Sequence, residues 1–317
     1  MPDTHRDSDP PPRISFGLFV RNEVETIETC IDSILGQTLA DIELVISDNA
    51  SDDGTREILQ KYAERDGRVR LYCQEQNLGL IDNVNFVIRA CQGEFVRLIG
   101  GHDWLEPNYA QGCVAAAEDN PGAIVVTTDF DIRDEYGHVR IGQYQGQRLE
   151  SESPLERLRM MLFFFKAGDA EYDPVYSAIR RDVLMKTGLI RMMEHADLVL
   201  SVELSLIGHF AHVNHVLAHR LKRVAHYKNR QAVFKSYRPE QHLELKTSAT
   251  RLLREFSTVA WRSNMSLSEK LSAQASFLFF YVRRVWRKRH LPFLRRTVKH
   301  GLRKLGLRRH NQAIKEK

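Results

Sequence analysis

The chain has 317 residues, of which 43% are hydrophobic and 27% charged; this composition is that of a globular protein and excludes a largely disordered one. Its net charge of +5 is uneven, because residues 281–317 hold 14 Lys or Arg and one acid, whereas the preceding 280 residues hold 32 basic and 40 acidic side chains. No apolar run approaches the roughly 18 residues that span a bilayer. With four scattered cysteines, no CxxC pair and no secretory signal in the proline-rich residues 1–12, we expect a cytoplasmic protein.

Four strand-like runs alternate with helical patterns over the first hundred residues. The runs are Ile14–Val20, Ile42–Ser47, Val69–Cys73 and Phe95–Ile99, and their ends are 27, 26 and 26 residues apart. Apolar residues recur on one helical face between the first two runs, with Asn22 as the predicted N-cap. Strand, helix and strand at this interval predict a parallel sheet, in which ligands bind beyond the carboxyl ends of the strands.

The rest of the chain is patterned less regularly. We predict the following elements: a strand over Ile124–Phe130, a helix over 153–166, a strand and a helix within 175–188, a helix over 195–209 that ends near Gly208, and strands over 210–221 and 224–228. Beyond about Pro239 the pattern is helical. The predicted organisation is therefore a disordered lead-in (1–12), an α/β domain (13–235) and a basic helical extension (236–317).

Acids and amides follow the second strand in VISDNASDDGT, residues Val45–Thr55. Asp48 ends the strand, and a helix cap is expected near Asp52 or Asp53. The motif is compatible with a plain capped loop, or with a site in which Asp48 accepts a hydrogen bond from a nucleotide. No GxGxxG follows the first strand and no GxxxxGK[ST] occurs, so the sequence supports neither a dinucleotide fingerprint nor a P-loop.

Four segments together resemble family 2 glycosyltransferases of the GT-A fold. They are ISFGLFVRNEVETIETCIDSILGQT, LVISDNASDDGT, NLGLIDNVNFVIRACQGEF and LIGGHDWLEPNY, in the order and spacing of that family. The resemblance is close over residues 13–110 and looser to about 230. It implies a Rossmann-like α/β fold with a mostly parallel central sheet. It also implies transfer of a sugar, with inversion, from a UDP-, GDP- or dTDP-linked donor to a hydroxyl of a glycan or lipid-linked acceptor, in bacterial surface polysaccharide or glycolipid assembly.

The resemblance assigns residues to the donor site. Arg21 stands where the family has a tyrosine, and arginine can both stack on a base and reach phosphate. The residues assigned to the donor are Val20, Arg21, Asn22, Asp48, Asn77, Gly79, Asn83, Asn85, Gly101, His102 and Asp103, with Arg220, Arg223 and His226 placed to close over the diphosphate. For the last three, a solvated basic strand is an equal alternative.

The metal-binding D-x-D motif of the family is altered in this chain. Gly100 and His102 stand where the family has the first and second Asp of the D-x-D, and only Asp103 matches an acid, the one that follows the motif. The resemblance implies that Asp103 and His102 hold a divalent cation, Mn²⁺ or Mg²⁺, with help from the diphosphate oxygens. Two alternatives remain: a metal-free site in which His102 acts as a cation toward phosphate, or an inactive site. Gly100 and Gly101 permit close approach of backbone to a ligand.

Asp197 opens a predicted helix where the family has its catalytic base. The resemblance therefore implies that Asp197 deprotonates the acceptor, with Glu194 in reserve. The structural alternative is that Asp197 only complements the helix dipole.

The basic C-terminal segment mixes Arg and Lys with aromatic and aliphatic residues at helical spacing. This pattern is typical of helices that lie on an anionic membrane surface, so we expect peripheral attachment at the inner face of the membrane. Packing on the body or on a second copy is the alternative, and no nucleic acid is expected, since no nucleic-acid-binding fold accompanies the segment.

Two rival functions remain for the whole chain. One is a nucleotide-sugar-binding or assembly protein that has lost catalysis, which the altered D-x-D favours. The other is a nucleotidyltransferase, which the lack of a Gly- and Lys-rich first loop disfavours.

Overall fold

A computed structural model describes residues 10–134, 136–142, 149–167, 174–222 and 249–283. The strands are β1 (Ile14–Val20), β2 (Ile42–Asp48), β3 (Val69–Cys73), β4 (Phe95–Gly100), β5 (Trp104–Leu105), β6 (Ala123–Asp134), β7 (Val139–Gly142), β8 (Ala178–Arg180) and β9 (His209–Lys222). The helices are α1 (Ile27–Leu35), α2 (Thr55–Arg65), α3 (Leu80–Ala90), α4 (Tyr109–Asp119), α5 (Pro154–Ala167), α6 (Arg181–Leu184), α7 (Ala196–Ile207) and α10 (Ala249–Arg262), with the 3-10 turn η1 (Pro174–Tyr176) and a helix over 267–283.

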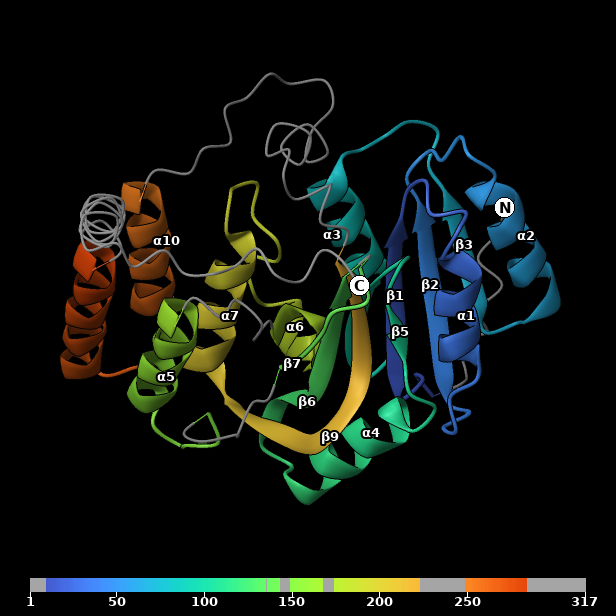
Figure 1. The fold of residues 1–317 in the computed structure, drawn as a ribbon. Coiled ribbons are helices and arrows are strands. Elements are labelled where there is room, and N and C mark those ends of the chain that lie inside the picture. The colour runs from blue at the N-terminus through green and yellow to red at the C-terminus, as the bar shows by residue number, and fades with distance from the viewer. Residues whose placement is uncertain (1–9, 135, 143–148, 168–173, 223–248, 284–317) are drawn as a thin grey trace, which may run out of the picture.

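Within these ranges, nine strands form one sheet in the order β3-β2-β1-β4-β8-β6-β9-β5, with β7 paired to β6 (Figure 1). The first four strands are parallel, as the sequence predicted, because each is joined to the next by a helical crossover. The short β8 runs antiparallel to both β4 and β6, and β9 runs parallel to β6. The second half of the sheet is therefore mixed.

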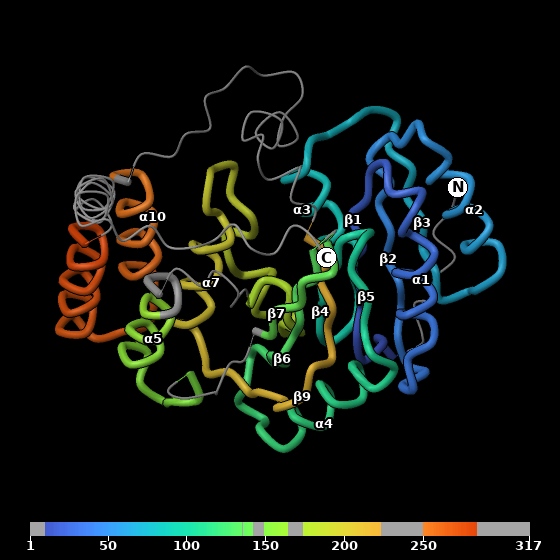
Figure 2. Tube along the Cα trace, in the orientation of Figure 1, coloured from blue at the N-terminus to red at the C-terminus, as the bar shows by residue number. Residues whose placement is uncertain are grey.

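Helices cover both faces of the sheet, and the trace in Figure 2 follows them in chain order. On one face, α1, α2 and α4 pack against Ile14, Phe16 and Leu18 of β1. On the other face, α3, α5, α7 and α10 form a second core with Val96 and Leu98 of β4. The alternation of side chains along each strand divides its apolar residues between these two cores.

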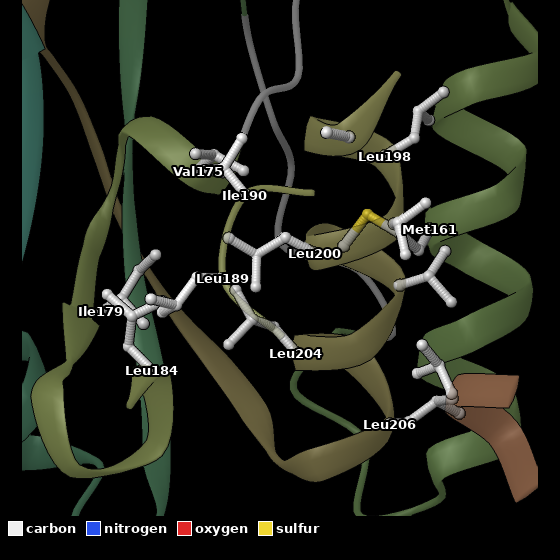
Figure 3. Close-up of a cluster of buried hydrophobic side chains, with 14 of the residues drawn as sticks. Met161, Val175, Ile179, Leu184, Leu189, Ile190, Leu198, Leu200, Leu204 and Leu206 are labelled. Carbon is white, nitrogen blue, oxygen red and sulfur yellow. The ribbon is translucent and has the colours of Figure 1, made fainter. Parts of the chain in front are cut away.

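The helix α7 is buried on almost every side. Leu198, Leu200 and Leu206 of this helix share one cluster with Met161 of α5, and Leu204 faces the loop that carries Leu189 (Figure 3). The C-terminal helices join the same core, which includes residues of α10 and of the helix over 267–283. The described part of the C-terminal extension therefore packs on the α/β domain through α7.

One predicted helix start was wrong. Asn22 is not the cap of α1, which begins at Ile27 after Thr26, because the Asn22 side chain is bonded to Asp52 and its backbone has a φ of 55°. Helix α2 begins at Thr55, directly after the predicted position near Asp52 or Asp53, and Asp53 Oδ1 accepts the Thr55 backbone N–H at 3.0 Å.

Other predicted elements have different lengths in the structure. The segment 175–188 forms a three-residue strand and a four-residue helix, and the strand predicted over 210–221 begins at His209 and continues to Lys222. The predicted strand at 224–228 and the basic segment beyond 283 lie outside the described residues. None of the described helices is long and apolar enough to cross a membrane.

Candidate active site

The register of the sheet brings three strand ends together. Val20 at the end of β1 pairs with Asp48 at the end of β2, and Phe19 pairs on its other side with Gly100 at the end of β4. The predicted donor loops after β1, β2 and β4 are therefore neighbours, at the edge of a parallel sheet where ligands bind.

Asp48 is fully buried, and both of its carboxylate oxygens are bonded. Oδ1 accepts the backbone N–H of Ser51 at 3.1 Å, and Oδ2 accepts Arg56 Nε at 2.7 Å. This hydrogen bond raises the pKa of Arg56 above its ordinary value. Asp48 therefore fixes the shape of the loop after β2. Asp52 and Asp53 are the exposed residues of that loop.

Amide side chains join the loops on either side of Asp48. Asn22 and Asp52 form two hydrogen bonds, at 2.7 and 3.1 Å, between the loops after β1 and β2. Asn49 Nδ2 donates to Asn77 Oδ1 at 2.9 Å, and Asn49 Oδ1 accepts the N–H of Leu78 at 2.7 Å. Sequence reasoning missed Asn49, whose position in a strand-end motif of polar residues was the available signal.

The other amide side chains of this region are hydrogen-bonded to groups within the protein. Asn77 Oδ1 also accepts the N–H of Gly79, which precedes α3 with a φ of 85°. Asn83 exchanges hydrogen bonds with Ser47, at 2.6 and 3.2 Å. Asn85 bonds both the N–H and the C=O of Ile190, so it ties α3 to the loop before α7. The structure thus gives Asn85 a positioning role within the fold.

Asp103 is buried beside the end of β9. Its Oδ1 accepts the backbone N–H of Leu221 at 3.2 Å and lies 3.9 Å from His102 Nε2. The His102 Nδ1 atom lies 3.1 Å from Glu23 Oε1, so a second carboxylate flanks the imidazole. Glu23 was missed by sequence reasoning, because it follows β1 and only the fold brings it against the loop after β4.

The two glycines of this loop have different surroundings. A Cβ at Gly101 would fall 3.0 Å from Glu23 Cγ, so Gly101 allows Glu23 to pack closely. A Cβ at Gly100 would lie 3.4 Å from the His102 ring and 3.6 Å from Asp103 Oδ2. Gly100 thus keeps open the space above the Asp103 carboxylate.

The side chains around Asp103 determine whether a divalent cation fits this site. Within the described ranges, no group of three or more His, Cys, Asp or Glu side chains is arranged to hold a metal ion. Asp103 Oδ2 nevertheless accepts no hydrogen bond from any described residue, although the side chain is only 6% exposed. Mg²⁺ is commonly held by one or two carboxylates together with substrate phosphates, so this single carboxylate fits a cation that is shared with a diphosphate.

Strand β9 is fixed beside Asp103 by a histidine between two carboxylates. His219 Nδ1 lies 2.8 Å from Asp131 Oδ1, and Nε2 lies 2.8 Å from Glu106 Oε1. Its ring stacks on Trp104, with centroids 5.1 Å apart. This network joins β5, β6 and β9, and it therefore positions the segment that contacts Asp103.

The other predicted residues lie in separate places. Arg21 is exposed in the loop after β1, and Asp197 is exposed in the first turn of α7, next to His195 in the left-handed region. Glu194 Oε1 is 3.7 Å from His195 Nε2. Arg220 lies on β9, adjacent to the Leu221 amide that contacts Asp103. Arg223 and His226 are outside the described residues.

Comparison with known proteins agrees with this arrangement. The sequence profile described as glycosyl transferase family 2 matches residues 15–188. The chain is 32% identical to EpsH of Bacillus subtilis over 124 residues, which are 39% of this chain and 36% of EpsH. It is 25% identical to chondroitin synthase of Escherichia coli over 240 residues, which are 74% of this chain and 32% of that protein. The chain thus spans about a third of the length of these relatives.

Among solved structures, S. aureus TarS 1–349 in complex with UDP-GlcNAc is similar to this chain. The TM-score is 0.61 at 15% identity, and the match covers 85% of this chain and 72% of that one. At this identity the likeness concerns the fold, and it confirms the predicted GT-A architecture.

Proposed function

Because the chain belongs to glycosyl transferase family 2, we propose that it transfers a sugar from a nucleotide-sugar donor to an acceptor hydroxyl with inversion. The observation that carries this proposal is that the end of β1 has Asp48 on one side and the Gly100–Asp103 loop on the other. A nucleoside laid along the β1–β2 edge would direct its diphosphate toward Asp103. The donor found in TarS and the names of the relatives support the same reaction in polysaccharide assembly.

Asp103 and His102 are the residues that would hold a divalent cation in this proposal. When bound, the cation would offset the negative charge of the diphosphate as it leaves the sugar. The chain's own part is to present Asp103 Oδ2 in a largely buried site, where the backbone N–H of Leu221 holds the other oxygen. His102 is in turn oriented by Glu23.

Asp197 is the proposed base. Its carboxylate takes the proton of the acceptor hydroxyl, and the hydroxyl oxygen forms the new bond to the anomeric carbon. The bond from that carbon to the diphosphate oxygen breaks at the same time, which inverts the carbon and releases the nucleoside diphosphate. The exposure of Asp197 at a helix start leaves it accessible to an acceptor.

The first test is calorimetric titration of the full chain with UDP, GDP and dTDP, each with and without Mn²⁺. We expect one nucleotide to bind, with an affinity that rises when Mn²⁺ is present and with no such rise in Asp103→Ala. Metal-independent binding would instead assign charge compensation to His102 and the basic side chains of β9. If none of the three nucleotides binds under either condition, the proposed function is wrong.

A product assay tests the stereochemistry. The nucleotide that binds is supplied as its sugar conjugate, and the anomeric configuration of the product is read by proton NMR. Inversion is the expected result, and retention would contradict a single displacement. Release of pyrophosphate from a nucleoside triphosphate and a sugar phosphate would instead support a nucleotidyltransferase.

We also propose that the acceptor is presented at an anionic membrane surface. The helix over 267–283 carries exposed apolar side chains at i, i+4, i+11 and i+15, which lie on one helical face. They are Leu267, Leu271, Leu278 and Val282, each more than half exposed. The basic segment follows directly in the sequence. An apolar stripe followed by cationic residues is the pattern of interfacial helices.

Vesicle sedimentation tests this contact. The full chain is expected to sediment with vesicles containing phosphatidylglycerol, less so at high salt, and not with pure phosphatidylcholine. Leu271→Ser with Leu278→Ser should weaken sedimentation. Val139→Ser with Ile141→Ser, which changes two exposed apolar residues of β7, should not. Equal sedimentation of both double variants would contradict the stripe as the contact.

A further inference from the structure

The sheet has an opening between β4 and β6. Strand β8 separates them only at its three residues, where it pairs with Phe95 and Val96 on one side and with Val125 and Val126 on the other. Beyond that point a small pocket of about 20 Å³, partly open to solvent, lies between the strands. We call it the β4–β6 pocket; its lining is Arg97, Thr127, Thr128, Phe130, Tyr176, Ser177, Ala218 and Arg220.

Arg97 brings a buried positive charge to this pocket. Its side chain is 1% exposed, its Nε donates to Tyr109 Oη at 3.0 Å, and its Nη1 donates to the carbonyl of Leu98. Within the described part of the chain, no carboxylate pairs with Arg97 and its Nη2 donates no hydrogen bond. The rings of Tyr109 and Tyr176, 5.3 and 5.9 Å from the guanidinium carbon, compensate the charge only in part. Burying a charge without a counter-ion is costly, so the pocket is electrostatically prepared for an anion.

A second guanidinium and two hydroxyls complete the lining. The Arg220 guanidinium carbon lies 4.3 Å from the centre of the Tyr176 ring and 5.9 Å from that of Phe130. Thr128 and Ser177 are nearly buried, and their hydroxyls make no hydrogen bond to other described residues. No acidic side chain is among the described lining residues. Two guanidinium groups and two hydroxyls in a pocket of this size match a single carboxylate group.

The pocket borders the proposed reaction centre. Arg220 precedes Leu221, whose amide is bonded to Asp103. Arg97 lies on β4, and the end of this strand at Gly100 leads directly into the loop that carries Asp103. A sugar whose diphosphate lies at Asp103, or an acceptor that approaches it, would be next to the β4–β6 pocket.

We propose that the β4–β6 pocket binds the carboxylate of an acidic sugar, a uronic acid, through Arg97 and Arg220. This inference rests on the proposed function, because it names the substrate class of the same site. The planar carboxylate accepts paired hydrogen bonds from guanidinium groups and from the hydroxyls of Thr128 and Ser177, while the sugar ring stays at the mouth of the pocket. The acidic sugar belongs either to the donor or to the end of the acceptor.

A two-arm binding experiment separates these sources. In the donor arm, calorimetry compares UDP-glucuronate with UDP-glucose. In the acceptor arm, glucuronate is compared with glucose on protein saturated with the nucleoside diphosphate that binds best. One arm should show at least about a 10-fold preference for the carboxylated sugar, as expected for a charge-assisted pair. Equal affinities for charged and neutral sugars in both arms would overturn the proposal.

Variants assign the preference to the pocket. Arg97→Met and Arg220→Gln should each reduce the preference to about 2-fold or less. Arg180→Gln is the matched control, because Arg180 lies on β8, pairs with Glu94 at 3.1 Å and is outside the pocket. Preference retained in both pocket variants would also overturn the proposal. Arg97→Met approximately keeps the side-chain volume and removes a buried charge, so the melting temperature of this variant should not fall greatly. If Arg97→Met does not fold, the carboxylate preference of Arg220→Gln tests the proposal.

Failure of this proposal is distinguishable from failure of the proposed function. If a nucleotide binds but no carboxylate preference exists, only the pocket assignment is wrong. If no nucleotide binds but glucuronate still binds better than glucose, and Arg97→Met removes the difference, the pocket assignment holds without the transferase. In that last case the acceptor arm is run without nucleotide.

Discussion

The end of β4 separates two regions: the edge formed by the ends of β1, β2 and β3, and the β4–β6 pocket. The two regions differ in how many of their polar groups are hydrogen-bonded within the protein. At the first edge, both oxygens of Asp48 and the amides of Asn49 and Asn77 are bonded within the protein. On the other side, Asp103 Oδ2, in the loop after β4, and Arg97 Nη2, in the β4–β6 pocket, have no hydrogen-bond partner among the described residues.

This difference indicates that one region holds the shape of the site and that the other contacts the charged parts of a ligand. A loop whose buried polar groups are all bonded holds its shape before a ligand arrives, which lowers the cost of ordering it on binding. A carboxylate oxygen and a guanidinium nitrogen that bond to no described residue can each bind a ligand group of opposite charge. We infer that the first edge positions the nucleotide and that the second region meets the charged and reacting groups.

The largest effect is expected from the proposed base. Asp197→Asn keeps the size of the side chain but cannot accept the acceptor's proton, so the transfer rate should fall by about 10²- to 10⁴-fold. Nucleotide affinity should be unchanged, because neither edge is altered. Initial rates and calorimetry on the same preparation measure both. Full transfer by a folded Asp197→Asn would end the assignment, and Glu194→Gln would then be tested.

Asp103→Asn should reduce transfer by about 10²- to 10³-fold and remove the dependence of nucleotide binding on Mn²⁺. Asn still accepts the Leu221 amide, so the fold should persist. Asp119→Asn, at the exposed end of α4, is the control for a general loss of negative charge. If Asp103→Asn kept its Mn²⁺ dependence, the cation would lie elsewhere, and the contrast between the two regions would be wrong.

Asp48→Asn should act mainly on the fold of the nucleotide edge. It leaves Arg56 without its ion-pair partner, and since Arg56 is a third exposed, the free energy of unfolding should fall by about 1–3 kcal/mol. Urea unfolding measures this loss, and nucleotide affinity should fall with it. Asp66→Asn breaks the more exposed pair with Arg68 and should cost less than about 1 kcal/mol. Equal losses in both variants would contradict a supporting role for Asp48.

The smallest effect concerns pH. Burial lowers the pKa of His212 from its ordinary value of 6.5, and Asp129, 3.3 Å away, opposes this only in part. Below about pH 6.5 the unfolded chain then binds the proton more readily than the folded one, so the free energy of unfolding falls as pH drops. Urea unfolding at pH 7.5 and 5.5 should show a larger drop in the wild type than in His212→Gln. Identical drops would show that other groups control this range.

Much of the first half of the molecule could be predicted from the sequence. The spacing of four apolar runs predicted the parallel strands β1–β4, and the polar residues at their ends predicted the position of Asp48 and Asp103 at one edge. Those signals are local: apolar periodicity and the small residues of strand-end turns are written in consecutive residues. The first helix start was missed because Asn22 bonds to Asp52, a partner thirty residues away.

The sequence by itself determined the family, the presence of the four strands β1–β4 and the residue types at their ends, because those depend on neighbours within a few positions. Only the tertiary structure decided that Glu23 meets His102, that His219 joins two carboxylates beside β9, and that Arg97 is buried next to Arg220. Such pairs are brought together by strand register and by the short β8, which leaves β4 and β6 apart. The charge balance of a site is a property of these long-range contacts, and no stretch of consecutive residues contains it.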